Sequence, residues 1–166
     1  MGFSEGRSVT LAGEWEFYPY TLLEEVPSNN THKSSQYIEV PGDWSTALNP
    51  DDSSPYGYGS YHLRILVNAE KDTTFTIRVP SVRSASALYV NGLLVGKSGD
   101  VGKSKEDSSA WNVPYTSKSI RADETGVLDI ELQVTNFVEP RSSGIVRSVK
   151  FGYEEDVEAE TQLSSI

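Results

Sequence analysis

The chain has 166 residues, of which 37% are hydrophobic, and it carries a formal net charge of −10 at pH 7. This length is sufficient for one domain with one hydrophobic core. The negative charge argues against nucleic acid as a partner and against direct contact with an anionic membrane, because both surfaces require clustered Lys and Arg. The absence of cysteine excludes disulfide bonds and thiolate chemistry.

Alternation of apolar and polar residues with a period of two predicts short strands along most of the chain. In chain order, the predicted strands are 15–18, 37–40, 61–67, 75–79, 87–90, 93–96, 111–115, 128–136 and 145–152. The clearest is LDIELQVTN at 128–136, in which the apolar side chains face a core and the polar ones face water. Helix signals are confined to two segments, TLLEEV at 21–26 and EEDVEAETQLSSI at 154–166. The second segment is predicted to be either a helix or a strand.

These elements predict an all-β fold, a two-sheet antiparallel sandwich of about eight or nine strands. The long connections 49–59 and 98–110 favour a jelly roll over an immunoglobulin-like Greek key. Asn91-Gly92 within LYVNGLLVG predicts a two-residue hairpin turn with positive φ at both positions. The following GKSGDVGKS ends like a phosphate-binding loop, but its glycine spacing is wrong and the next residues form a poor helix. We interpret it as a flexible or ligand-binding loop.

The sequence offers little for metal or cofactor chemistry. His32 and His62 are its only histidines, and without cysteine they are too few for a zinc site. His62 falls on the outer face of its predicted strand, which is typical of an ordinary surface histidine. We expect no metal site and no cofactor, while the acidic residues Asp51, Asp52 and Asp100 leave calcium open.

Carbohydrate binding requires an aromatic ring that stacks on a sugar and planar polar side chains that bond its hydroxyl groups. Trp44 and Trp111 lie near predicted strand ends and are candidates for the ring, with core packing as the alternative. Asn136 continues the apolar face of its strand and is expected at the rim of the sandwich. Arg83 lies in a corner of small residues before the hairpin. Asn136 and Arg83 each either brace a loop or bind a ligand.

Several segments together are similar to known families of domains. LAGEWEFY, VPGDW, YGSYHLRILV, LYVNGLLVGKSG and LDIELQVTN resemble, in this order, the sugar-binding jelly-roll domain of family-two glycoside hydrolases such as β-glucuronidase. A closer likeness is to the extracellular galactose-binding-like domain of bacterial seven-transmembrane receptors with diverse intracellular signalling modules. Its segments are EFYPYTLL, YGYGSYHLR, VPSVRSASALYVNG, VGKSKED and VTNFVEPRSSGI. The loop 97–101 favours the receptors, because the hydrolases have a pattern like His-x-Gly-Gly-Tyr there.

The resemblance implies a noncatalytic domain that senses a carbohydrate or related small molecule at the extracellular face of the membrane, in a parent protein such as a sensor histidine kinase. Residues 1–10 are then a tag or a disordered start, 11–152 the galactose-binding-like sandwich, and 153–166 a tail leading toward a membrane segment. The alternatives are an accessory domain of a glycoside hydrolase and an interaction or homodimerisation module without a small ligand. The positions that match recurrent family motifs are Tyr61, Arg64, Arg83, Asn91, Asn136, Arg141 and Ser143.

Overall fold

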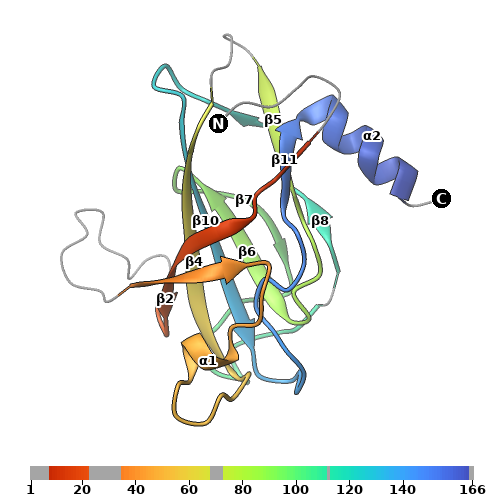
Figure 1. Cartoon of the computed structure of the whole chain (residues 1–166). Coiled ribbons are helices and arrows are strands. Elements are labelled where there is room, and N and C mark those ends of the chain that lie inside the picture. The colour runs from red at the N-terminus through yellow and green to blue at the C-terminus, as the bar shows by residue number, and fades with distance from the viewer. Residues whose placement is uncertain (1–7, 23–34, 68–72, 112, 165–166) are drawn as a thin grey trace.

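The computed structural model describes residues 8–22, 35–67, 73–111 and 113–164, and they form two antiparallel sheets (Figure 1). The five-stranded sheet consists of β1 (Val9–Thr10), β5 (Thr74–Val79), β8 (Tyr115–Thr116), β9 (Ile120–Arg121) and β11 (Lys150–Tyr153). The six-stranded sheet consists of β2 (Gly13–Pro19), β3 (Gln36–Val40), β4 (Gly57–Leu66), β6 (Ala85–Val90), β7 (Leu93–Ser98) and β10 (Val127–Asn136). Its spatial order is β3-β2-β4-β10-β6-β7. The predicted all-β sandwich is confirmed.

The core lies between the two sheets and accounts for the alternating pattern of the sequence. On β10, the even-numbered residues from Leu128 to Val134 are buried. They belong to one hydrophobic cluster with Phe75 of β5 and Phe151 of β11, whose rings stack with centroids 5.1 Å apart. Burial on one face of each strand, at about 25 cal/mol per Å² of apolar surface, is what holds the sandwich together.

Most predicted strands are present, but two of them were wrong in extent. The strand predicted at 111–115 is β8, which begins only at Tyr115, and Trp111 lies in the loop before it. The strand predicted at 145–152 is β11, which begins at Lys150, while Ile145 and Val149 are buried without joining a ladder. In the second segment alternation reports burial of individual side chains without pairing of strands, whereas in the first it reports neither, because Trp111 and Val113 are exposed.

Two helices accompany the sheets in the described part of the chain. The sequence did not predict α1 (Ser45–Leu48). For the last segment it left a helix or a strand open, and the structure shows a helix, α2 (Glu154–Ser164). Val157 of α2 is buried, and Thr74 Oγ1 of β5 donates a hydrogen bond to Glu154 Oε2 (2.9 Å). No helix in the described part of the chain is long and apolar enough to cross a membrane. The helical turns predicted at 21–26 fall mostly outside the described residues.

The first and last described segments both join the five-stranded sheet. Val9 and Thr10, in the stretch expected to be disordered, pair as β1 with Phe151 and Lys150 of β11. The backbone N of Ser8 donates a hydrogen bond to Glu160 Oε1 of α2 (3.0 Å). Within the described residues, 8–10 and α2 are therefore part of the packed structure.

The β6–β7 hairpin turns at Asn91-Gly92, as the sequence predicts. Asn91 and Gly92 have φ values of 50° and 82°, both in the left-handed region that a type I′ turn requires. Asn91 Oδ1 accepts a hydrogen bond from Asp129 N (2.8 Å), and Asn91 Nδ2 donates one to Val127 O (3.3 Å). The Asn91 side chain thus fastens the hairpin to the start of β10.

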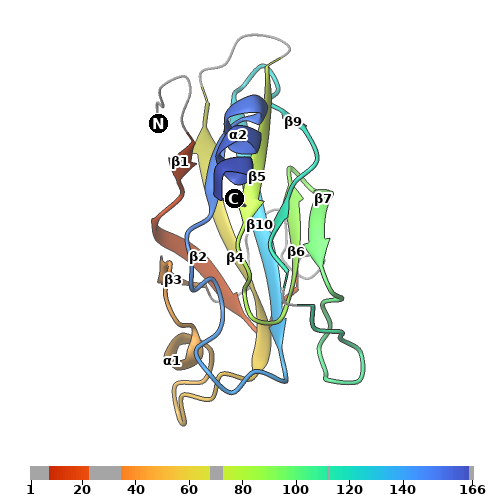
Figure 2. The ribbon, with the colours of Figure 1, turned by 90° about the vertical axis from the view of Figure 1, so that its right-hand side faces the viewer.

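This turn lies at the opposite end of the six-stranded sheet from the loops that follow β7 and β10. Asp129 lies beside the turn, and the distance along β10 from Asp129 to Asn136 is roughly 23 Å. α1 and the loops after β7 and β10 lie together at the far end (Figure 2). Asn91 and Asn136, which both match recurrent family motifs, are too far apart to share a small site.

We expect Gly92→Val to lower the free energy of unfolding by about 2 kcal/mol, because a β-branched residue is strained in the left-handed region. A Cβ at position 92 would meet nothing within 4 Å, so the loss reports backbone strain alone. Gly92→Asn is the control and is expected to retain most of the stability, since asparagine tolerates this conformation. Urea unfolding measures both. An unchanged midpoint for Gly92→Val would contradict the turn assignment.

Candidate functional site

Asn136 ends β10 and is fully buried (0% exposed) at the end of the sandwich that carries α1. Its Nδ2 lies 2.9 Å from each of three acceptors, the carbonyl oxygens of Pro55 and Glu139 and the hydroxyl of Ser143. Its Oδ1 accepts hydrogen bonds from the backbone N of Val138 (3.2 Å) and of Glu139 (2.9 Å). The amide therefore ties the loop before β4 to the loop after β10.

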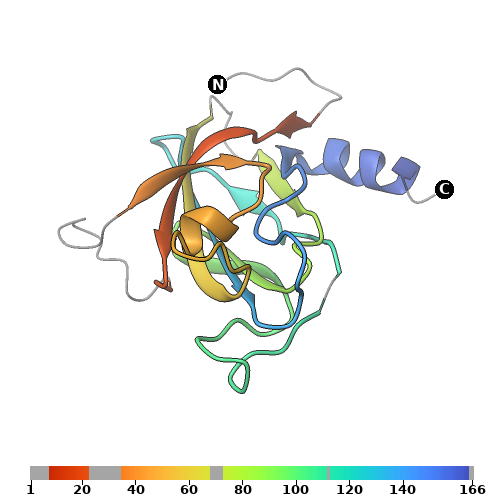
Figure 3. The ribbon, with the colours of Figure 1, turned by 60° about the horizontal axis from the view of Figure 1, so that its bottom comes forward.

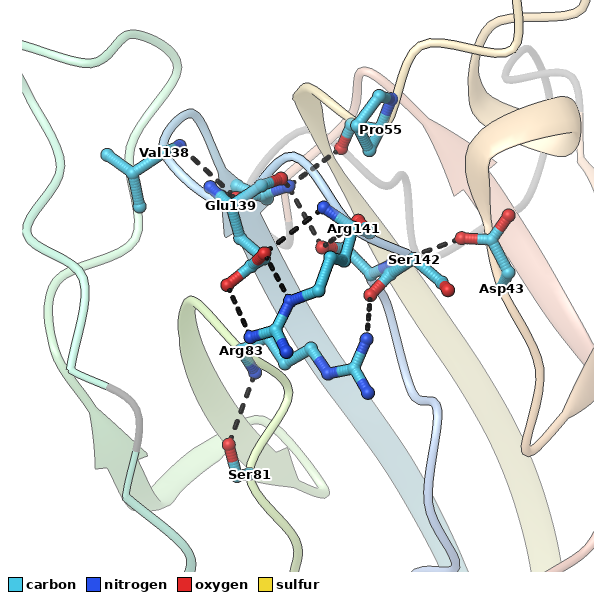
Figure 4. Close-up of polar contacts among 10 residues, drawn as sticks. Asp43, Pro55, Ser81, Arg83, Val138, Glu139, Arg141 and Ser142 are labelled. Carbon is cyan, nitrogen blue, oxygen red and sulfur yellow. Dashed lines mark hydrogen bonds and ion pairs between the residues drawn. The ribbon is translucent and has the colours of Figure 1, made fainter.

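The guanidinium group of Arg83 is bonded to the loop after β10, and that of Arg141 forms an ion pair within this loop (Figure 4). Arg83 Nη1 donates a hydrogen bond to Ser142 O (2.9 Å). Arg141 contacts the carboxylate of Glu139 through Nε (2.8 Å) and Nη2 (3.0 Å). This bidentate contact, with a further bond from the Arg141 backbone N, lowers the pKa of Glu139 to about 2. The structure thus brings Arg83, Asn136, Arg141 and Ser143 together as a loop brace.

Trp44 and Tyr61 belong to the core. Their rings stack with centroids 6.4 Å apart, and both residues are fully buried. Trp44 Nε1 donates a hydrogen bond to Pro55 O (3.0 Å), and the Tyr61 hydroxyl accepts one from Ile145 N (3.3 Å). Burial raises the pKa of Tyr61 well above its ordinary value. Neither ring has a face open to a sugar, so the stacking role predicted for Trp44 is corrected to core packing.

Arg64 lies apart from these residues, on the outer face of the six-stranded sheet. Its Nε bonds Asp129 Oδ1 at 2.8 Å. His62, predicted to be an ordinary surface histidine, lies between two carboxylates, with Nε2 at 3.0 Å from Asp129 and Nδ1 at 2.9 Å from Glu16. An anionic ligand at this face would meet both carboxylates. Among the described residues, no group of three or more His, Cys, Asp and Glu could hold a metal ion.

A hollow of about 370 Å³ lies beside β7, lined by Lys97, Gly99, Asp100, Ser109 and Trp111. Its volume is within the range of small-molecule clefts, about 300–1,000 Å³. Trp111 is 68% exposed, whereas Trp15 and Trp44 are almost fully buried. Lys97 Nζ lies 3.1 Å from Asp100 Oδ1. The hollow thus combines an open aromatic face with one ion pair.

The backbone of the loop 99–111 is held in a defined conformation around this hollow. Asp100 and Ser109 exchange backbone hydrogen bonds of 2.8 and 2.9 Å, and the Ser98 hydroxyl donates one to Trp111 O. Gly99 has a φ of +72°, and a Cβ there would lie 2.1 Å from Ser109 O. Glycine at position 99 is therefore required for the two arms of the loop to approach each other.

A contact with β10 fixes the same loop to the sheet. Thr135 Oγ1 accepts a hydrogen bond from Gly102 N (3.1 Å) and donates one to Gly102 O (2.8 Å). Thr135 was predicted to face water, but it is buried. The loop then extends away from the sandwich beside β6 and β7 (Figure 3). Trp111 consequently stands on a loop that is tied at both ends.

Sequence reasoning identified Trp111 but missed Lys97, Asp100 and Ser109 as its neighbours. These residues lie together because the backbones of Asp100 and Ser109 pair. The sequence around these two positions has no periodic pattern that would predict the pairing. The glycine in KSGD is the available sequence signal, since a glycine directly after a strand indicates a tight turn or a close backbone contact.

No protein-family model matches the chain, and no curated protein matches it. Solved structures do share its fold. The chain is 18% identical to a GH2 β-galacturonidase of Eisenbergiella tayi, solved with galacturonate, with a TM-score of 0.59 over 87% of this chain and 24% of that one. It is 16% identical to a β-glucuronidase of Ruminococcus gnavus, with a TM-score of 0.66 over 91% of this chain and 29% of that one. The fold is thus that of a domain within GH2 glycosidases, and the chain spans only 24–29% of their length.

We expect Asn136→Asp to destabilise the protein by at least about 3 kcal/mol, because a fully buried side chain gains a charge and its three acceptors, of which Ser143 is buried, lose their donor and face a carboxylate. Asn49→Asp is the matched control. Asn49 Nδ2 donates to two backbone carbonyls, Ser54 O (2.8 Å) and Tyr56 O (2.9 Å), from a half-buried position. Water can replace those bonds in part, so a loss of about 1 kcal/mol is expected. Urea unfolding measures the free energy of unfolding of both variants. Equal, small losses would contradict the bracing role of Asn136.

Proposed function

We propose that this domain is a noncatalytic module that binds a carbohydrate in the hollow beside Trp111. The observation that carries the proposal is the position of the Trp111 ring, which is 68% exposed on a loop tied down at Ser98 and Thr135. A large apolar ring that such a loop holds in solvent exposes apolar surface to water, and a ligand that covers this surface gains free energy. A sugar ring supplies the complementary surface, because its C–H groups stack on an aromatic face.

The polar groups around Trp111 match sugar hydroxyl groups. Lys97 supplies N–H donors, Asp100 supplies carboxylate acceptors, and the Ser109 hydroxyl can do both. Because Lys97 and Asp100 form an ion pair, the hollow has no net charge. A neutral sugar is therefore favoured over an anionic one, especially in a chain with a net charge of −10.

Two observations support a role in binding and not in catalysis. The structural neighbours named above are glycosidases, but the chain covers less than a third of their length. Glycoside hydrolysis by the usual mechanisms needs two carboxylates that flank the scissile bond. Among the residues that line the Trp111 hollow, Asp100 is the one carboxylate, and it is paired with Lys97.

We further propose, on the sequence resemblance, that the domain belongs to a membrane sensor such as a histidine kinase and faces the outside of the cell. The loop 97–101 supports this assignment, because it departs from the pattern expected in the hydrolases. The coding sequence beyond residue 166 provides the test. Several apolar stretches of about 20 residues would support a receptor, whereas the alternating strands and helices of a barrel would replace it with a hydrolase.

We expect Trp111→Ala to weaken sugar binding at least about tenfold, because the stacking surface is lost. Tyr37→Ala is the matched control, since Tyr37 is an equally exposed aromatic residue (69%) on β3, at the other edge of the six-stranded sheet. A panel of neutral mono- and oligosaccharides is screened by thermal shift, in which a sugar at 100 times its Kd adds about 2.7 kcal/mol. Calorimetric titration then compares the variants.

Two results would contradict this function. One is the absence of a thermal shift with every sugar of the panel. The other is equal weakening by Trp111→Ala and Tyr37→Ala. If no sugar binds and light scattering shows a mass that rises with protein concentration, an interaction or homodimerisation module replaces the binding module.

A further inference from the structure

A second, smaller hollow of about 190 Å³ adjoins the first one. The two share Lys97, Gly99 and Asp100 as lining residues. The second hollow extends from β7 across the outer face of the six-stranded sheet, and its other lining residues are Ala87, Tyr89, Leu94, Val101 and Gln133. The two hollows therefore form one continuous depression that begins at Trp111 and ends on β10.

The register of the strands explains why this depression exists. Gln133 of β10 is directly opposite Ala87 of β6, and Ala87 is directly opposite Lys97 of β7. All three side chains lie on the outer face of the sheet. Because Ala87 has only a methyl group, the longer side chains of Gln133 and Lys97 stand on either side of a gap about two strand spacings wide, roughly 10 Å.

Gln133 has an unused hydrogen-bond donor at the far end of the depression. The residue is 4% exposed, and within the described part of the chain its Nε2 has no hydrogen-bond partner. A buried amide without a partner is destabilising, so a hydrogen-bond acceptor placed in the hollow would stabilise it. The terminal torsion of glutamine is soft, and the amide can turn its N–H groups toward the hollow.

We propose that the smaller hollow is a second sugar subsite, and that the carbohydrate contains at least two linked neutral sugar units. This inference rests on the proposed function, with the first unit stacked on Trp111. The second unit lies over Ala87, and one of its hydroxyl oxygens accepts a hydrogen bond from Gln133 Nε2. Tyr89 and Leu94 supply the apolar surface for this unit. Gln133 is then a specificity residue that distinguishes a disaccharide from a monosaccharide.

The experiment compares monosaccharides with their dimers by calorimetric titration of the full chain. The probes are glucose with cellobiose, galactose with β-1,4-galactobiose, and xylose with xylobiose. In at least one pair the dimer is expected to bind about tenfold more tightly, the effect of one additional stacked and hydrogen-bonded unit. A dimer that binds no more tightly than its monomer in every pair would overturn the second subsite and leave the first one standing. No binding by any probe would overturn the proposed function, and the second subsite with it.

Substitution of Gln133 assigns the effect to its amide. Gln133→Met keeps the length of the side chain and removes the donor, so it is expected to abolish most of the preference for the dimer while the affinity for the monomer stays unchanged. Thr76→Val is the matched control, because Thr76 Oγ1 is another buried polar atom without a partner in the described residues, on the other sheet. A preference for the dimer that survives Gln133→Met, or that Thr76→Val reduces equally, would overturn the role of Gln133.

Discussion

The alternation of side chains along β10 is the constraint on which both the core and the candidate site depend. β10 lies between β4 and β6 and pairs with both. Its even-numbered residues fill the core, so a shift of one residue would move all of them to the outer face. The same register places Gln133 and Thr135 on the outer face, where Thr135 anchors the loop that presents Trp111. The geometry of the hollows is thus set by the packing of the core.

Asn136 and Gln133 of β10 are both buried amides, and their hydrogen bonds distinguish them. Asn136 uses its amide nitrogen and oxygen in five contacts with neighbouring loops. A side chain so fully engaged stabilises the fold but has nothing left to offer a ligand. Gln133 carries the same functional group with its nitrogen unpartnered in the described structure. Buried amides that look alike in sequence therefore differ in what they can offer a ligand, and the hydrogen-bond partners of each atom show the difference.

The parts of the fold that follow from local pattern could be predicted from the sequence. A strand with one buried face must alternate, and a two-residue turn with positive φ favours Asn-Gly, so β10 and the β6–β7 hairpin were identified. The bracing role of Asn136 was one of two predicted alternatives, because an amide on an apolar face must find partners.

The rest depends on contacts between distant positions. Short strands such as β1 and β8 exist because a longer neighbour pairs with them, and two residues carry no period of their own. Trp44 and Trp111 both lie near strand ends in sequence, yet one is in the core and the other is exposed. The difference arises from the Gly102–Thr135 and Asp100–Ser109 bonds, which hold the second tryptophan outside. No local pattern encodes either bond.

Charge narrows the class of carbohydrate that fits the proposed binding surface. The outer face of the six-stranded sheet carries Glu16, Asp129 and Glu131, and burial raises the pKa of Glu131. His62 and Arg64 are bonded to the first two of these carboxylates, and Lys97 is bonded to Asp100. Arg64 and Lys97 are thus already paired with carboxylates, and an acidic sugar would find neither of them free. A fold shared with uronide-cleaving enzymes does not transfer their ligand, and the hydrogen-bonding groups that line the two hollows match the uncharged hydroxyl groups of a neutral glycan.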